Sequence, residues 1–304
     1  MNENVAVVHT LPAAPFRAAQ RHHMLGSVVL PAAAALVPPW VIPLDGHAAF
    51  VALLLVGMWF LVGGLGVSVG LNRLFSHRAF EASPPLRAAL AVLGSMAAQG
   101  PLLYWVALHR MHHASSDRPG DPHSSQPSAW PGMRRWRAAW QGHIGWVADH
   151  DVPKPTRYAR ELLADPLARK LSRAYPLCVL AGLVLPAVAA WAWMGGWEGL
   201  AFGAYWGGVL RIALGHHVIW AINSWCHLQG GRPNETGDAS ANVAWLALLS
   251  WGESWHNNHH AQPTQARFGR GWRQPDVGWW LIRLLATLDW ACIKPAQSGN
   301  ANPA

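Results

Sequence analysis

The sequence predicts an all-α integral membrane protein with four transmembrane helices and a cytoplasmic helical cap. Three observations support this prediction. The chain of 304 residues is 52% hydrophobic and only 12% charged, about half the charged fraction of a typical soluble domain. It contains four long apolar runs, each close to the roughly 20 residues that cross a bilayer core. Most of its 17 histidines lie just outside these runs.

The apolar runs contain no Asp, Glu, Lys or Arg except at one position, Arg211: they are Met24–Leu44, Gly46–Leu71, Pro176–Trp197 and Gly199–Trp225. We therefore predict two helical hairpins, about 24–71 and 176–225. Burial inside a large soluble protein is the alternative for such runs. It is disfavoured here because a chain so poor in charge offers little polar surface to cover four apolar helices.

The basic residues predict the orientation of the hairpins. Of the 23 Lys and Arg residues, 14 lie between Arg73 and Arg173, and Arg17 and Arg21 precede the first run. The positive-inside rule then places the N-terminal segment 1–23 and a cap formed by 72–173 and 226–294 on the cytoplasmic side. This topology accounts for the net charge of +8 without nucleic acid, for which the sequence has no binding motif.

Two segments outside the hairpins have distinct compositions. The alanine-rich tract Arg87–Gln99 predicts a helix at the membrane interface or a re-entrant segment. The tail 295–304 follows the last apolar segment of the single domain 24–294, and we predict that it is disordered.

The histidines predict a site with two metal ions. Two stretches, "HRMHH" and "HNNHH", share the spacing i, i+3, i+4, which places three side chains on one face of a helix. Two more histidines follow apolar runs, in "NRLFSH" and "NSWCH". The eight are His77, His109, His112, His113, His227, His256, His259 and His260. Unpaired polar groups at such a position are costly, and a metal ion would satisfy them.

The number of imidazoles bears on the kind of metal. Imidazole nitrogen binds iron, zinc, copper and nickel. Eight imidazoles are too many for one tetrahedral zinc and suit two six-coordinate metals. Redox-active iron fits this count best, while the ligand type leaves zinc open.

Three carboxylates are placed to hold these histidines. Asp117 and Asp121 follow the first cluster in "SSDRPGDPH", and Glu253 precedes the second by three residues. Carboxylates commonly accept the second ring N–H of a ligating histidine, so we predict this role for all three. Solvated surface carboxylates are the alternative.

The motifs resemble, in order and spacing, those of membrane fatty acyl desaturases of the stearoyl-CoA desaturase type, especially bacterial acyl-CoA desaturase-like proteins. The matching stretches run from about Val67 to Phe268: "NRLFSHRAF", "HRMHHASSDRPGDPHS", "HHVIWAINSWCHLQGGRP" and "GESWHNNHHAQP". The resemblance implies a protein of the bacterial inner membrane. Its cytoplasmic cap would hold two non-haem irons. It implies O2-dependent desaturation of a fatty acyl chain carried by CoA, acyl carrier protein or lipid.

The resemblance also implies roles for particular residues. The eight histidines correspond to iron ligands of the family, and Asn223 corresponds to an asparagine that holds a metal-bound water. One position departs from the pattern: the first histidine of the first box is replaced by Asn72. An amide oxygen is a harder and weaker donor than imidazole. We expect Asn72 to bind one iron directly or through water, or to leave that iron weakly held.

Electrons are expected to come from a separate ferredoxin, cytochrome or flavoprotein reductase, since the sequence has no C-x-x-C iron site and no G-x-G-x-x-G nucleotide loop. A related di-iron hydroxylase, acetylenase or tailoring enzyme is the nearest alternative. A non-catalytic metal-binding or transport protein is the alternative from another class. Transport would favour ionisable groups within the spans, where this sequence has few.

Overall fold

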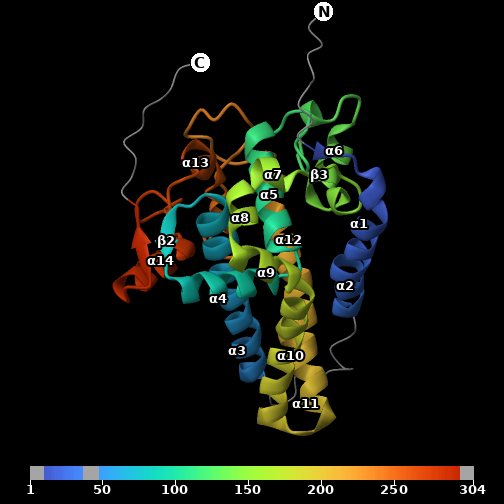
Figure 1. Cartoon of the computed structure of the whole chain (residues 1–304), viewed down its shortest axis with the longest axis vertical. Helices are drawn as coiled ribbons and strands as arrows, with labels where there is room; N and C mark the ends of the chain where they lie inside the picture. Colours follow the sequence, from blue (N-terminus) through green and yellow to red (C-terminus); the bar gives the residue numbers. More distant parts are fainter. Residues whose placement is uncertain (1–9, 37–47, 295–304) are drawn as a thin grey trace, which may run out of the picture.

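The computed structural model describes residues 10–36 and 48–294, and this part of the chain is mostly helical. Figure 1 shows α3 (Ala48–Met58), α10 (Tyr175–Met194) and α11 (Gly196–Gly203) extending from one end of the molecule. The shorter helices and the strands gather towards the other end. The prediction of a helical protein is therefore confirmed.

Two helices in the described part of the chain are long and apolar enough to cross a membrane, Leu53–Ser76 and Tyr175–Met194. They fall in the second and third predicted runs. The fourth run is helical through α11, η6 (Ala204–Leu210) and α12 (Arg211–Ser224), but Arg211 and two histidines make it more polar. The structure thus supports two of the four predicted spans by length and composition.

The first predicted run lies only partly within the described residues. It begins at the end of α1 (Arg17–Met24) and continues through the π-helix η2 (Leu25–Val29) and α2 (Leu30–Ala35). Residues 37–47, where this run ends and the second begins, lie outside the described part, as does the predicted disordered tail 295–304. The arrangement of four membrane helices stays a prediction.

A π-helix carries the chain from the second run to the histidines. η3 (Trp59–Ser76) continues α3 for 18 residues, whereas π-helices usually occur as single turns inside α-helices. At its end the N–H of His77 donates to the carbonyl of Asn72 (3.1 Å). Because the π-helical hydrogen bond joins residues five apart, Asn72 and His77 lie one turn apart. The sequence did not predict this helical form.

The remaining α-helices are short and lie in the two segments predicted to form the cap: α4 (Pro84–Ser95), α5 (Leu102–Ser115), α6 (Arg135–His143), α7 (Pro155–Tyr158), α8 (Arg160–Ala164), α9 (Pro166–Arg173), α13 (His256–Ala261) and α14 (Val277–Thr287). Their starts follow local rules. Pro84 and Pro85 occupy the first turn of α4, where the missing N–H is harmless. The Asp165 carboxylate caps α9 by accepting from the N–H of Leu167 (2.8 Å).

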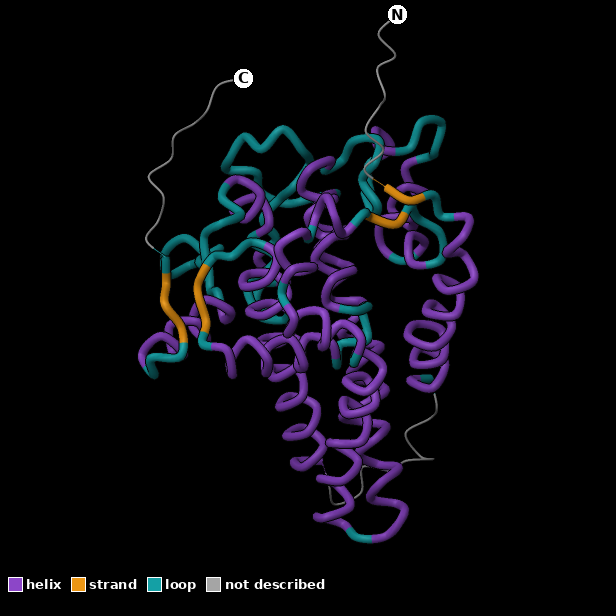
Figure 2. Tube along the Cα trace, in the orientation of Figure 1, coloured by secondary structure: helices purple, strands orange, loops and turns teal. Residues whose placement is uncertain are grey.

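Two pairs of short antiparallel strands, which the sequence did not predict, join distant segments. β1 (Thr10–Leu11) pairs with β3 (Val152–Pro153), and β2 (Phe80–Ala82) pairs with β4 (Ala291–Ile293). Figure 2 shows the two pairs on opposite sides of the helices. The second pair fastens the segment just after His77 to the end of the described chain.

Glycines allow the helix backbones to touch. A Cβ at Gly66 of η3 would lie 2.5 Å from the backbone nitrogen of Gly94 in α4. A Cβ at Gly203 of α11 would lie 2.1 Å from the carbonyl oxygen of Pro186 in α10. Only glycine permits these approaches, which are typical of helix pairs in apolar surroundings.

Arg211, the single charge in the fourth run, joins three helices. It is only 3% exposed, and its guanidinium donates to the carbonyls of Gly207 (3.1 Å), Met96 (3.0 Å) and Gly182 (3.2 Å). Met96 caps the end of α4. Gly182 lies four residues before Pro186, whose ring removes the N–H that would otherwise bond the Gly182 carbonyl. The buried charge therefore replaces hydrogen bonds that α4 and α10 cannot make themselves.

We expect Arg211→Leu to lower the free energy of unfolding by about 1–3 kcal/mol, the order of cost for one buried carbonyl left without a donor. Adding Pro186→Ala should recover part of this loss, because the new N–H can bond the Gly182 carbonyl. Thermal unfolding in detergent of the wild type, both single variants and the double variant measures the coupling. Additive effects of the two substitutions would contradict it.

Candidate metal centre

Four elements supply the eight histidines singled out in the sequence. α5 and α13 supply three each, η7 (Trp225–His227) supplies its last residue, and His77 caps the C-terminal end of η3. The structure brings all eight together in two groups of four. Cluster A consists of His77, His109, His113 and His259, and cluster B consists of His112, His227, His256 and His260. Within each cluster the candidate ligand atoms lie within 4.8 Å of one another.

The i, i+3, i+4 spacing explains why α5 and α13 each contribute to both clusters. On α5, His109 and His113 point to cluster A and His112 to cluster B. On α13 the division is reversed, because His259 points to cluster A while His256 and His260 point to cluster B. Each helix therefore runs alongside both clusters and supplies ligands to both from one face.

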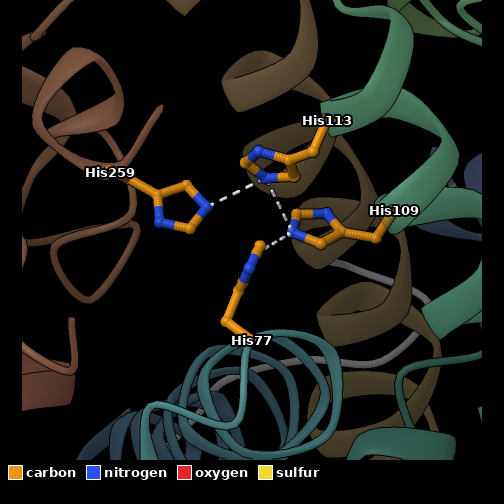
Figure 3. Close-up of side chains that lie close together, drawn as sticks. All are labelled: His77, His109, His113 and His259. Atoms are coloured by element: carbon orange, nitrogen blue, oxygen red, sulfur yellow. Dashed lines mark hydrogen bonds between the residues drawn. The ribbon is translucent and has the colours of Figure 1, made fainter. Parts of the chain in front are cut away.

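The nitrogen spacing fits a metal ion in each cluster. In cluster A the Nε2 atoms form a chain, with 2.7 Å from His77 to His109, 3.2 Å on to His113 and 3.1 Å on to His259 (Figure 3). In cluster B the Nε2 atoms of His227 and His256 are 3.1 Å apart. Two nitrogens about 2.1 Å from one metal are about 3.0 Å apart at a right angle and about 3.4 Å apart at the tetrahedral angle. The observed distances of 2.7–3.2 Å are close to these values.

Aspartates accept hydrogen bonds from the Nδ1 atoms of three imidazoles of cluster B. The Nδ1–H of His227 donates to Asp117 (2.8 Å), that of His112 to Asp121 (3.0 Å) and that of His260 to Asp238 (2.6 Å). A histidine that donates through Nδ1 keeps its Nε2 lone pair free for a metal. The buried Nε2 atoms of His112 and His260 have no hydrogen-bond partner, which is the state expected of metal ligands.

Glu253 has partners other than the expected histidines. Its carboxylate accepts from the side chains of Ser68 and Asn72 on η3 and from Arg73 (2.6 Å). No hydrogen bond joins it to a histidine of α13 in the described part of the chain, which corrects the expectation drawn from its position in the sequence. The turn between Gly252 and Trp255 separates the carboxylate from α13.

The two asparagines stand in different places. Asn72 is buried, and its Oδ1 atom has no hydrogen-bond partner. Asn223 is half-buried near the end of α12, four residues before His227, and its backbone carbonyl accepts a long hydrogen bond from Ser125 (3.5 Å).

Sequence reasoning missed two residues of the site. Asp238, which bonds His260, is one of only 15 acidic residues in the chain, so the scarcity of acids that singled out Asp117 and Asp121 also applied to it. His123 is buried with His112 and Asp121 in a third group of possible ligands. It lies within the quoted stretch "HRMHHASSDRPGDPHS", but its spacing gave no signal.

The asparagines of "HNNHH" hold α13 in place. Asn258 accepts from the side chains of Asn234 (3.1 Å) and Asn242 (3.0 Å) and donates to the carbonyl of Phe268 (2.9 Å). Asn257 likewise accepts from Asn234 and donates to its carbonyl (3.0 Å). A helix of six residues has little stability of its own, so this buried network fixes the direction of its three histidines.

Burial keeps most of the clustered imidazoles neutral. It lowers the pKa of His77 to about 3 and that of His260 to about 4. It also lowers the pKa values of four others well below 6.5: His109, His113, His256 and His259. For His112 burial alone would lower the pKa, but the adjacent Asp121 carboxylate raises it. Neutral imidazole is the form that binds metals.

The fold and the site together define a helical protein with two adjacent histidine sites that can each hold a metal ion. Residues 45–296 match the family model for fatty acid desaturase. The chain is 42% identical over 231 residues to the hex-5-enoyl-[acyl-carrier protein] acetylenase of Moorena producens (strain JHB), covering 75% of this chain and 72% of that protein. It is 36% identical over 247 residues to the sn-1 stearoyl-lipid 9-desaturase of Anabaena variabilis, covering 79% and 81%.

The chain belongs to the fatty acid desaturase family. It is an oxidoreductase that acts on fatty acyl chains. The sequence-based assignments of family and enzyme class are thereby confirmed.

We expect Asn258→Ala to destabilise the protein by about 2–3 kcal/mol, because several buried partners lose their hydrogen bonds at once. Gln262→Ala, which changes an exposed amide at the end of the same helix, should have little effect. Thermal unfolding of both variants in detergent makes the comparison. Equal melting temperatures would show that the network does not hold α13.

Proposed function

We propose that this protein catalyses the O2-dependent desaturation of a fatty acyl chain at a non-haem di-iron centre. One observation carries the proposal: eight buried imidazoles form two adjacent groups of four, and nitrogens in each group face one another at metal-ligand spacing. Clusters A and B would each hold one iron. Asn72 and Asn223 would be weak or water-mediated ligands, and Asp117, Asp121 and Asp238 would orient the histidines.

Bound iron supplies the activation of O2 that removal of hydrogen from an unactivated CH2 group requires. The protein has to position the acyl chain and to keep water out. The clusters lie in a site from which water is largely excluded, because burial lowers the pKa values of six of the eight histidines: His77, His109, His113, His256, His259 and His260. Electrons would come from a separate ferredoxin, cytochrome or flavoprotein reductase.

A small cavity marks the proposed path of the acyl chain. It has a volume of about 20 Å³ and lies between η3 and α12, with walls that include Val67, Gly215, Ile219 and Trp251. Ile219 lies about one helical turn from Asn223, so the cavity lies close to the level where α12 meets the site. Since this volume suits about one water molecule, an acyl chain would have to displace a wall side chain, and Trp59 and Trp251 are the largest.

We propose that four helices cross the bacterial inner membrane as the hairpins 24–71 and 176–225, with the metal site on the cytoplasmic side. Exposed apolar side chains on α10 support a lipid-facing surface: they are Leu177, Leu180, Val184, Leu185 and Val188. Trp191, Trp193 and Trp197 are exposed towards the tip of the same hairpin, where an aromatic belt would meet the opposite membrane interface.

Acetylenase activity is the second candidate. It is favoured by the 42% identity to a protein whose name describes an acetylenase. A hydroxylase remains the third outcome that the same chemistry allows. For all three activities the acyl carrier has to be determined by experiment, because the relatives' names describe both carrier-protein and lipid substrates.

The mass of the product separates these activities. We expect the reduced, iron-loaded enzyme to remove two hydrogens from a saturated acyl chain that is supplied on CoA, acyl carrier protein or lipid. An enzyme that removes two hydrogens from an alkene but none from a saturated chain would be an acetylenase. A product that gains one oxygen would indicate a hydroxylase. His256→Ala, which removes a cluster B nitrogen, is the control. An enzyme with two irons that changes none of these substrates would contradict the proposal.

Gly215 tests the acyl path. No atom lies within 4 Å of the position of a Cβ at Gly215, so Gly215→Leu should fold but extend into the cavity. We expect kcat/KM to fall about tenfold or more while the metal content stays unchanged. Gly26→Leu, at another open helical position, should retain the activity. Equal kcat/KM values in the two variants would move the acyl path elsewhere.

A further inference from the structure

The two clusters differ in how their histidines are supported. Three of the four cluster B histidines donate to aspartates, which are Asp117, Asp121 and Asp238. In the described residues no hydrogen bond joins a cluster A histidine to a carboxylate; His77, His109 and His113 have other imidazoles as hydrogen-bond partners. The Nδ1 atoms of His259 in cluster A and of His256, the fourth histidine of cluster B, are both buried without a partner, so the difference lies in the three aspartates.

Position 72 adds a second difference. Asn72 stands where the family pattern has a histidine, one π-helical turn before His77 of cluster A. Its Nδ2 donates to the Glu253 carboxylate, so the residue that replaces the family's histidine is the one that pairs with this carboxylate. The Oδ1 atom on the other side of the amide is left without a partner. Cluster A therefore has four imidazoles, and the residue that the family pattern makes a histidine is an amide bonded to Glu253.

Support from a carboxylate makes imidazole a more basic ligand and fixes its direction, and loss of such a partner typically lowers metal affinity about 10–100-fold. Cluster B has three such partners, whereas cluster A has none in the described residues and one ligand fewer than the family pattern. We infer that cluster B is the tight metal site and fills first, and that cluster A is a weak site whose affinity is set by residue 72. This inference rests on the proposed two-metal function.

Titration with cobalt tests this order. The metal-free, full-length protein in detergent is titrated with Co2+ without oxygen, and bound cobalt is measured by absorption and by mass spectrometry after desalting. We expect one Co2+ to bind tightly and a second more weakly. His256→Ala, which removes a nitrogen from cluster B, should abolish the tight step. His109→Ala, which removes one from cluster A, should leave the tight step and abolish the weak one.

Two further variants change the affinities in opposite directions. Asp238→Asn should weaken the tight step about 10–100-fold and leave the weak step in place. Asn72→His should strengthen the weak step by a similar factor, because one ring nitrogen can donate to Glu253 while the other faces cluster A. A gain of affinity cannot result from misfolding. Glu81→Gln, at a carboxylate that is 72% exposed on β2, is the matched control and should change neither step.

The outcomes separate this inference from the proposed function. Two steps of equal affinity in the wild type, or loss of the tight step in His109→Ala, would overturn the order of filling and leave the two-metal centre intact. An Asn72→His variant with an unchanged weak step would overturn the role of residue 72. A protein that binds no Co2+ at cluster A and none at cluster B would overturn both the inference and the di-metal proposal.

Discussion

The rest of the structure depends on the contact between buried imidazoles. A neutral imidazole has one donor and one acceptor nitrogen. When Nδ1 donates to an aspartate, as in His112, His227 and His260, Nε2 is left as a buried acceptor. Acceptors that face one another in a site of low polarity are unfavourable without a cation between them. The arrangement therefore favours a cation between the imidazoles, and the surrounding helices hold the imidazoles in position to bind one.

Short helices can hold such a site only because other parts of the chain fix them. α13 has six residues and depends on the amides of Asn257 and Asn258 for its position. α5 is longer and is held by the Arg110 guanidinium, which donates to the carbonyls of Ser76 (2.8 Å) and Phe75 (2.9 Å) at the end of η3. The residues between the histidines thus do as much for the site as the histidines do.

The sequence could predict the ligands better than the framework that carries them. The i, i+3, i+4 spacing is a local property of a helix, so it identified residues that the fold brings together. Glu253 shows the limit, because its side chain turns to Asn72 on η3 and no spacing within its own segment indicates this. The π-helix η3 was equally hidden, since its i to i+5 bonds depend on packing against α4 and α5 and leave no distinct residue pattern. The apolar runs predicted helices, but composition alone could not tell how Arg211 would be accommodated.

The hydrogen bond from Arg211 to the Gly182 carbonyl, which Pro186 leaves without a donor in its own helix, has a consequence for how the chain is made. α10 is synthesised first, and the Gly182 carbonyl then has no partner because Pro186 cannot supply one. α12 emerges later with a charge that is costly in apolar surroundings. Each helix is unfavourable alone, and both become acceptable when the guanidinium reaches the carbonyl. Residues 175–224 would therefore enter an apolar phase together as one hairpin. Neither α10 nor α12 would insert stably before the other has been synthesised.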